Sequence, residues 1–177
     1  MFFAFALFLA GAAHFARGAV TKEYQVKAVF LFNFAQFVQW PPKALKGSEP
    51  FCIGVLGEDP FDGFLDETVK GEMVDGHPLV VRRFASVEEV KKCQILFISR
   101  SEMGRLDAIF AALKGRSILT VGDDEGFIRK GGITRFVMDQ NKVHLRISPN
   151  AAKREGLVIS SKLLRLAEIE DHGEMAP

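Results

Sequence analysis

The stretch Phe51-Cys52-Ile53-Gly54-Val55-Leu56 is an unbroken apolar run, and Gly57-Glu58-Asp59-Pro60 follows it directly. A short apolar run with a turn at its end is typical of a strand that is buried on both faces of a sheet. Asp is favoured at the cap of a helix and Pro in its first turn, so a helix is expected to begin at Asp59 and Pro60. The stretch therefore predicts a strand followed by a helix, the unit from which parallel sheets are built.

The chain repeats this alternation on the carboxyl side of the run. We predict further strands at Leu79–Phe84, Ile95–Ile98 and Ile118–Val121. Short helices are expected from Ser86, which forms a capping box with Glu89, to about Lys92 and over Leu106–Lys114. Strands and helices that alternate with short connections indicate an α/β fold, with a mostly parallel sheet and helices on both faces.

The pattern changes beyond residue 121. Ile133–Met138 and Val143–Ile147 alternate apolar and polar residues on either side of the turn Asp139-Gln140-Asn141, which predicts a C-terminal antiparallel hairpin. We expect a short helix over Pro149–Glu155 and a closing helix over Ser160–Ile169 to complete the fold.

The length of the chain, 177 residues, suits one domain, and no repeat or linker interrupts residues 20–169. We expect a single α/β domain over residues 20–169 and a flexible tail over residues 170–177. Lys and Arg number 23 against 22 Asp and Glu. This balance argues against binding to nucleic acid, which requires a clear basic excess.

The N-terminal segment is predicted to be a secretion signal. Residues 2–13 form an apolar stretch that fits the hydrophobic region of a signal peptide and is too short to span a membrane. Cleavage after Gly18 would place Ala16 where signal peptidase requires a small residue. We therefore expect residues 1–18 to be removed and the mature chain to lie in the periplasm, without insertion into the membrane. No Lys or Arg precedes the apolar stretch, so either the signal is atypical or the start site is placed too late. The alternative to a signal is a buried N-terminal helix of a cytosolic protein.

Cys52 and Cys93 are the two cysteines of the chain, and each lies at the start of a predicted strand. In an oxidising compartment two cysteines indicate one disulfide, and close parallel strands would bring both thiols to one edge of the sheet. A bond that closes a loop of this length would stabilise the fold by about 4 kcal/mol. The alternative is two separate buried thiols. A zinc site is excluded because no other Cys or His lies at ligand spacing from either one.

The sequence carries no recognisable catalytic, cofactor or metal motif. Gly54-Val55-Leu56-Gly57 lies where phosphate-binding loops occur, but it lacks the glycine spacing of a dinucleotide site, and Glu58 and Asp59 would repel a phosphate. Asp123-Asp124-Glu125 is the densest group of carboxylates, and we interpret it as a solvated surface turn rather than a metal site. No Gly-x-Ser-x-Gly motif is present. We therefore predict no catalytic residues, no cofactor and no metal.

The first helix, predicted over Lys22–Trp40, is apolar over an unusually wide arc, and Pro41 and Pro42 end it. Such a helix is either packed on two sides or partly exposed to a partner. We predict that part of it joins the last helix in a surface that binds a partner protein or a second copy of the chain. The residues predicted to form this surface are Phe30, Phe34, Phe37, Trp40, Leu163 and Leu166. The alternative is that the helix is wholly buried.

Ordered blocks of residues carry a resemblance to a known family. The blocks are Lys27–Phe34 with Phe37 and Trp40-Pro41, Gly76–Val81, Cys93–Ser99, Leu119–Asp123, Phe127, Gly131–Ile133, Ala151-Ala152 and Gly156–Leu164. Together they resemble the YfiR-like family over residues 24–169. The resemblance implies a periplasmic α/β protein, often dimeric and without known catalysis. Its relatives bind the periplasmic domain of an inner-membrane diguanylate cyclase, repress cyclic-di-GMP synthesis and so lower biofilm formation.

Two departures from the family pattern stand out. Some members carry a second cysteine pair before the hairpin, and residues 123–132 contain none, so redox control through a second bridge is not expected here. The family usually has Ile-Asn after the second hairpin strand, whereas this chain has Ile147-Ser148-Pro149, which changes the cap of the next helix.

Two functions remain open from the sequence. The first is the repressor, whose partner is an inner-membrane sensor such as a diguanylate cyclase or another signalling protein. The second is a module that binds a small ligand in the crevice at the carboxyl ends of the strands. Polar residues follow the predicted strands at Glu58-Asp59, Ser99-Arg100-Ser101 and Asp123-Asp124, but they do not form a recognisable catalytic set.

Overall fold

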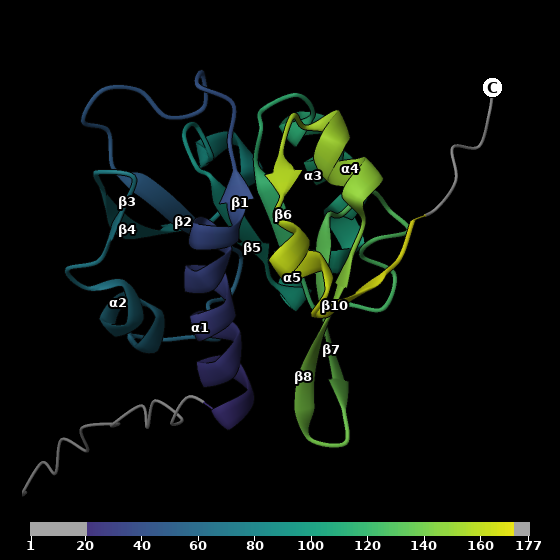
Figure 1. Ribbon diagram of the computed structural model, residues 1–177. Coiled ribbons are helices and arrows are strands. Elements are labelled where there is room, and N and C mark those ends of the chain that lie inside the picture. Colours follow the sequence, from purple (N-terminus) through teal and green to yellow (C-terminus); the bar gives the residue numbers. More distant parts are fainter. Residues whose placement is uncertain (1–20, 172–177) are drawn as a thin grey trace, which may run out of the picture.

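The structure is a computed structural model that describes residues 21–171 (Figure 1). The signal peptide predicted over residues 1–18 and most of the predicted tail lie outside the described residues. At the centre is an eight-stranded sheet with the strand order β10-β8-β7-β6-β5-β2-β4-β3. Its strands are β2 (Phe51–Leu56), β3 (Met73–Val74), β4 (His77–Phe84), β5 (Ile95–Ile98), β6 (Leu119–Gly122), β7 (Thr134–Asp139), β8 (Lys142–Ile147) and β10 (Ala167–Ile169).

Neighbouring strands of this sheet run parallel, except for the antiparallel pairs β7–β8 and β3–β4. A separate two-stranded antiparallel sheet joins β1 (Val38–Gln39) to β9 (Val158–Ile159). The helices are α1 (Lys22–Phe37), α2 (Phe64–Val69), η1 (Val87–Glu89), η2 (Arg100–Arg105), α3 (Leu106–Leu113), α4 (Pro149–Arg154) and α5 (Ser161–Leu164), where η marks a 3-10 helix. The predicted fold class, a mostly parallel α/β sheet with helices on both faces, is confirmed.

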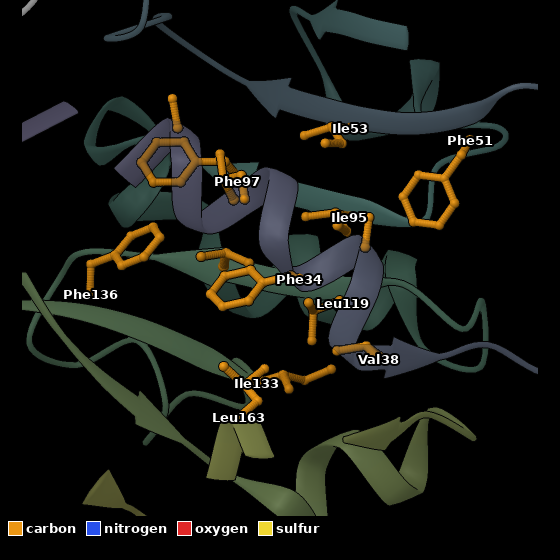
Figure 2. Close-up of a cluster of buried hydrophobic side chains, with 14 of the residues drawn as sticks. Phe34, Val38, Phe51, Ile53, Ile95, Phe97, Leu119, Ile133, Phe136 and Leu163 are labelled. Carbon is orange, nitrogen blue, oxygen red and sulfur yellow. The ribbon is translucent and has the colours of Figure 1, made fainter. Parts of the chain in front are cut away.

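Strands β2 and β5 are apolar throughout because each of them contributes to two cores. In β2, Phe51, Ile53 and Val55 belong to the core that includes α1, whereas Cys52 and Leu56 belong to the core that includes α3. Successive side chains of a strand point to opposite faces, so a strand covered by helices on both sides has no polar position. Figure 2 shows the first of these cores, where side chains from α1, the strands and α5 meet.

The predicted hairpin is confirmed as β7 and β8, paired from Thr134 opposite Ile147 to Asp139 opposite Lys142. Gln140 and Asn141 form its two-residue turn with positive φ angles of 45° and 60°, as a tight hairpin turn requires. Strand β6 pairs only with the first two residues of β7. The rest of the hairpin therefore projects beyond the carboxyl ends of the parallel strands (Figure 1).

The end of the chain differs from the prediction of one closing helix over Ser160–Ile169. The helix α5 is a single turn, and Ala167–Ile169 instead form the edge strand β10, parallel to β8. Arg146 of β8 forms ion pairs with Glu168 (2.9 Å) and Glu170 (3.4 Å), which hold this edge strand in place. The helical spacing of the apolar residues was outweighed by pairing with an unfilled sheet edge.

Other helix boundaries also differ from the prediction, and the helix expected from Ser86 to about Lys92 is only the 3-10 helix η1. The first helix ends at Phe37 rather than at Trp40, because Val38 and Gln39 pair with β9. The helix after β2 begins at Phe64 rather than at Asp59. The Asp59 side chain instead accepts a hydrogen bond from the Phe61 amide (2.7 Å) and so forms a turn before the helix.

Candidate functional site

Two of the six residues predicted to bind a partner are buried inside the chain. Phe34 is fully buried and stacks on Phe136 of the hairpin, with the ring centroids 6.1 Å apart. Leu163 of α5 is buried in the same core (Figure 2). Neither side chain can reach a partner in the folded chain, so both are removed from the predicted surface. They are apolar because they fill the space between α1, α5 and the sheet.

The other four residues differ in their exposure. Phe30, Phe37 and Trp40 are half-buried and pack against the core. The Trp40 indole also donates a hydrogen bond to the Gln94 carbonyl (3.1 Å), so this ring has a structural role. Leu166 is 75% exposed. It and the half-buried aromatic rings are the part of the predicted surface that remains accessible.

The end of α1 and the segment before α5 are brought together by the small sheet of β1 and β9. The Ser160 amide donates a hydrogen bond to the Phe37 carbonyl (2.8 Å). Phe37 and the exposed Val158 line a shallow hollow of about 260 Å³ between the two segments. Backbone pairing therefore joins the end of the first helix to the segment that precedes α5.

The two cysteines lie beside each other, as their places in the sequence predicted. Strands β2 and β5 are adjacent and parallel, and the Cys93 thiol lies 3.5 Å from the Cys52 carbonyl oxygen. Both thiols are free and buried in the structure. Burial, with the neighbouring Cys52, raises the pKa of the Cys93 thiol. A side chain at Gly54 would come within 2.8 Å of the Cys93 sulfur, so glycine provides the room for this thiol.

A buried ion pair lies at the carboxyl ends of β5 and β6. The Lys27 ammonium of α1 contacts the Asp123 carboxylate at 2.5 Å, and both side chains are only 1% exposed. Asp123 directly follows β6, and Arg100 at the end of β5 donates to its other oxygen (3.0 Å). Lys27 also contacts Glu23, one turn earlier on α1 (2.5 Å). One carboxylate thus joins α1 to the ends of two strands.

Tyr24 completes this cluster. Its hydroxyl donates a hydrogen bond to Asp123 (3.0 Å), and the Lys27 ammonium lies 4.3 Å from the centre of its ring. Burial and the neighbouring Asp123 carboxylate raise the pKa of Tyr24 well above its usual value, so the hydroxyl stays protonated. Burial alone would raise the pKa of Asp123, but the hydrogen bond and charge of Lys27, with the charge of Arg100, hold it below its usual range.

The interpretation of Asp123-Asp124-Glu125 as a solvated turn is wrong for its first residue. Asp123 is buried in the ion pair, whereas the Asp124 carboxylate accepts a hydrogen bond from the Gly126 amide (2.9 Å) and Glu125 is exposed. Within residues 21–171 no group of three or more Asp, Glu, His or Cys side chains could hold a metal ion. Sequence reasoning missed Lys27. The signal that could have found it is a lone Lys within the apolar arc of the first helix, four residues after Glu23.

The other polar residues that follow strands do not join the cluster. Asp59 forms an ion pair with Arg83 (2.8 Å), on the far side of β2. The Glu58 amide donates a hydrogen bond to the Ser101 hydroxyl (3.0 Å). The Ser101 side chain therefore occupies the turn where a phosphate-binding loop would hold its ligand. Among these polar residues, Arg100 and Asp123 join the cluster as an ion pair, whereas Glu58 and Ser101 meet only through a backbone amide.

The chain is thus an α/β protein in which a long first helix is tied by a buried ion pair to the ends of a mostly parallel sheet. Residues 24–168 match the family model DUF4154, described as YfiR/HmsC-like. The chain belongs to this YfiR/HmsC-like family. No helix within residues 21–171 has the length and apolar character needed to cross a bilayer.

Solved structures with a similar fold are more distant. One is a protein from Vibrio cholerae O1 biovar El Tor, described as a conserved domain protein, with a TM-score of 0.57 and 12% identity over 84% of this chain. Another is the ABC domain from Streptococcus pneumoniae in complex with L-Trp, with a TM-score of 0.54 and 13% identity over 83% of this chain. This chain spans 60% of the length of each. No curated protein sequence matches the chain significantly.

Proposed function

We propose that this protein is a periplasmic, non-catalytic regulator that binds the periplasmic domain of an inner-membrane signalling protein and represses it. The proposed target is a diguanylate cyclase, so binding lowers cyclic-di-GMP synthesis. The observation that carries the proposal is membership of the YfiR/HmsC-like family across residues 24–168, nearly all of the described chain. Repression requires that the protein bind the inactive state of its target more tightly than the active state.

The proposed contact surface is the accessible remainder of the surface predicted from the sequence. It comprises Leu166, which is exposed, and the half-buried rings of Phe30, Phe37 and Trp40. Exposed Val158 beside Phe37 extends it across β9. Aromatic and aliphatic anchors of this kind carry much of the free energy of protein–protein binding. A homodimer through the same surface stays a prediction.

Replacement of Leu166 by Asp should abolish repression without unfolding the protein. Deletion of the gene is expected to raise cyclic-di-GMP in the source bacterium, and the wild-type gene should restore the low level. The Leu166→Asp variant should fail to restore it, because losing a buried apolar anchor costs about 2 kcal/mol or more of affinity, roughly thirtyfold. Cyclic-di-GMP is measured in cell extracts by mass spectrometry.

The matched control for this experiment is Met73→Asp. Met73 is also an exposed apolar residue, but it lies in β3 at the opposite edge of the sheet. This variant should restore the low cyclic-di-GMP level. If deletion leaves the level unchanged, the proposed function is wrong. If both variants repress like the wild type, the proposed repressor function stands, but the proposed contact surface around Leu166 is wrong.

We also propose that Cys52 and Cys93 form a disulfide in the periplasm, because Cys52 lies in β2, Cys93 lies two residues before the adjacent strand β5, and the Cys93 thiol is 3.5 Å from the Cys52 carbonyl oxygen. Protein from the periplasm, denatured and alkylated without reductant, should carry no adduct and should gain two after reduction. Denaturation is needed because both thiols are buried. A Cys93→Ser variant should gain one adduct without reductant. Two adducts on the unreduced wild-type protein would contradict the disulfide.

A further inference from the structure

A pocket of about 360 Å³ lies between the carboxyl ends of β5 and β6 and the projecting part of the β7–β8 hairpin. Its size is within the range of pockets that hold small molecules. Four cationic side chains line it, against two carboxylates. The cations are Lys27, Arg100, Arg135 and Arg146, and the carboxylates are Asp123 and Glu125. The side chains that line the pocket therefore include more cations than carboxylates.

Arg135 is the cation whose charge is left without a carboxylate. Its side chain belongs to a residue that is only 6% exposed. One guanidinium nitrogen, Nη1, donates to the Glu125 carbonyl oxygen (2.7 Å), whereas the buried Nε has no hydrogen-bond partner. Lys27 and Arg100 share Asp123, and within residues 21–171 no carboxylate forms an ion pair with Arg135. Buried charges are nearly always paired, because an unpaired one loses its hydration without compensation.

The hairpin register makes this arrangement more costly. Arg135 of β7 lies directly opposite Arg146 of β8. Like charges at directly opposed positions destabilise an antiparallel pair. Arg146 is compensated by Glu168 and Glu170, on the side of β10. Of the two opposed arginines, Arg135 is therefore the one whose positive charge has no carboxylate partner within the described chain, and it lines the pocket. Among the described residues, Arg135 is thus the one cation of the pocket lining that no carboxylate compensates, and its unsatisfied guanidinium is suited to an anion.

We propose that this pocket binds a small organic carboxylate, with its carboxylate on the Arg135 guanidinium. A guanidinium edge and a carboxylate match as two parallel hydrogen bonds. Val137, two residues after Arg135 and on the same face of β7, supplies apolar surface to the pocket, which suits a short hydrocarbon or aromatic body and not a bare inorganic ion. Asp123 and Glu125 oppose a doubly charged phosphate more strongly than a singly charged carboxylate. The site is independent of the proposed repression, and either can fail without the other.

Benzoate is the probe that tests this site, with benzamide as its uncharged equivalent of the same shape. In two-dimensional ¹H–¹⁵N NMR titrations of the chain without residues 1–18, benzoate should shift the amide signals of the β7–β8 hairpin and of the segment after β6. Benzamide should bind at least about tenfold more weakly, because it cannot make charge-assisted hydrogen bonds. Arg135→Gln should weaken benzoate by a similar factor. Arg129→Gln removes the same charge at an exposed position outside the pocket and should leave binding unchanged.

A second variant protects the test against loss of folding, since Arg135 is buried. Arg100→Gln changes a side chain that is mostly exposed but lines the same pocket, and it should also weaken benzoate. The carboxylate site is wrong if benzoate gives no shifts, if benzamide binds equally well, or if the shifts map away from the hairpin. Tighter binding of inorganic phosphate than of benzoate would also overturn it, in favour of an inorganic oxyanion site.

Discussion

Replacement of Phe34 by Ala should lower the free energy of unfolding by about 3–5 kcal/mol, the range for truncating a buried aromatic side chain. The Phe34 ring is fully buried in the core of Figure 2 and packs against the rings of Phe136 and Phe30. The cavity left behind cannot close, because the surrounding strands are fixed by their hydrogen bonds. Urea denaturation followed by circular dichroism gives the change.

Val29→Ala is the matched control on the same helix. Val29 is exposed, so its truncation should change the free energy of unfolding by less than about 1 kcal/mol. The sequence left open whether Phe34 binds a partner or fills the core, and the two roles predict opposite results. A Phe34→Ala variant with wild-type stability and lost partner binding would show that the buried position in the structure is incorrect.

Replacement of Lys27 by Met should destabilise the protein by about 3 kcal/mol or more. The substitution removes one partner of a buried pair and leaves the Asp123 carboxylate without its shortest contact. The matched control is Lys70→Met, which breaks an exposed ion pair with Glu67 and should cost less than about 1 kcal/mol. The two free energies of unfolding are compared by urea denaturation at neutral pH.

The double variant Lys27→Met with Asp123→Leu separates pairing from burial. Replacing both members of a buried pair by apolar groups is often far less costly than removing one. The double variant should therefore be more stable than Lys27→Met alone. If the single variants at Lys27 and Asp123 together account additively for the double variant, the two residues do not act as a pair.

The same pair predicts a loss of stability in acid. The pKa of Asp123 is lower in the folded chain than in the unfolded chain, so the unfolded chain binds a proton more readily. The stabilisation from Asp123 is therefore present above the ordinary pKa of an Asp, about 4, and is lost as the pH falls through the lower pKa of the folded chain. Between pH 5 and pH 3 the free energy of unfolding should therefore fall further for the wild type than for the double variant. The difference should be about the amount expected for the protonation of one carboxylate. Equal losses would contradict this assignment.

Local patterns in the sequence were sufficient for the class of fold. The apolar run at Phe51–Leu56 predicted a strand with two covered faces, because only a strand with helices on both sides tolerates apolar residues at every position. The alternation of apolar and polar residues on either side of the turn Asp139-Gln140-Asn141 predicted the hairpin, and the structure gives Gln140 and Asn141 the positive φ angles of a tight connection. The blocks from Lys27 to Leu164 indicated the family. Each of these signals is contained within a few consecutive residues.

Only the tertiary structure decided which side chains meet. Lys27 and Asp123 are 96 positions apart, and they pair because α1 crosses the sheet where β6 ends. Arg135 and Arg146 face each other because of the hairpin register. Ala167–Ile169 form a strand and not a helix because a sheet edge was open to them. The hydrophobicity of Phe34 explains why its side chain is buried away from water. Only the order of the strands determines that the ring stacks on Phe136 of the same chain and not on a partner.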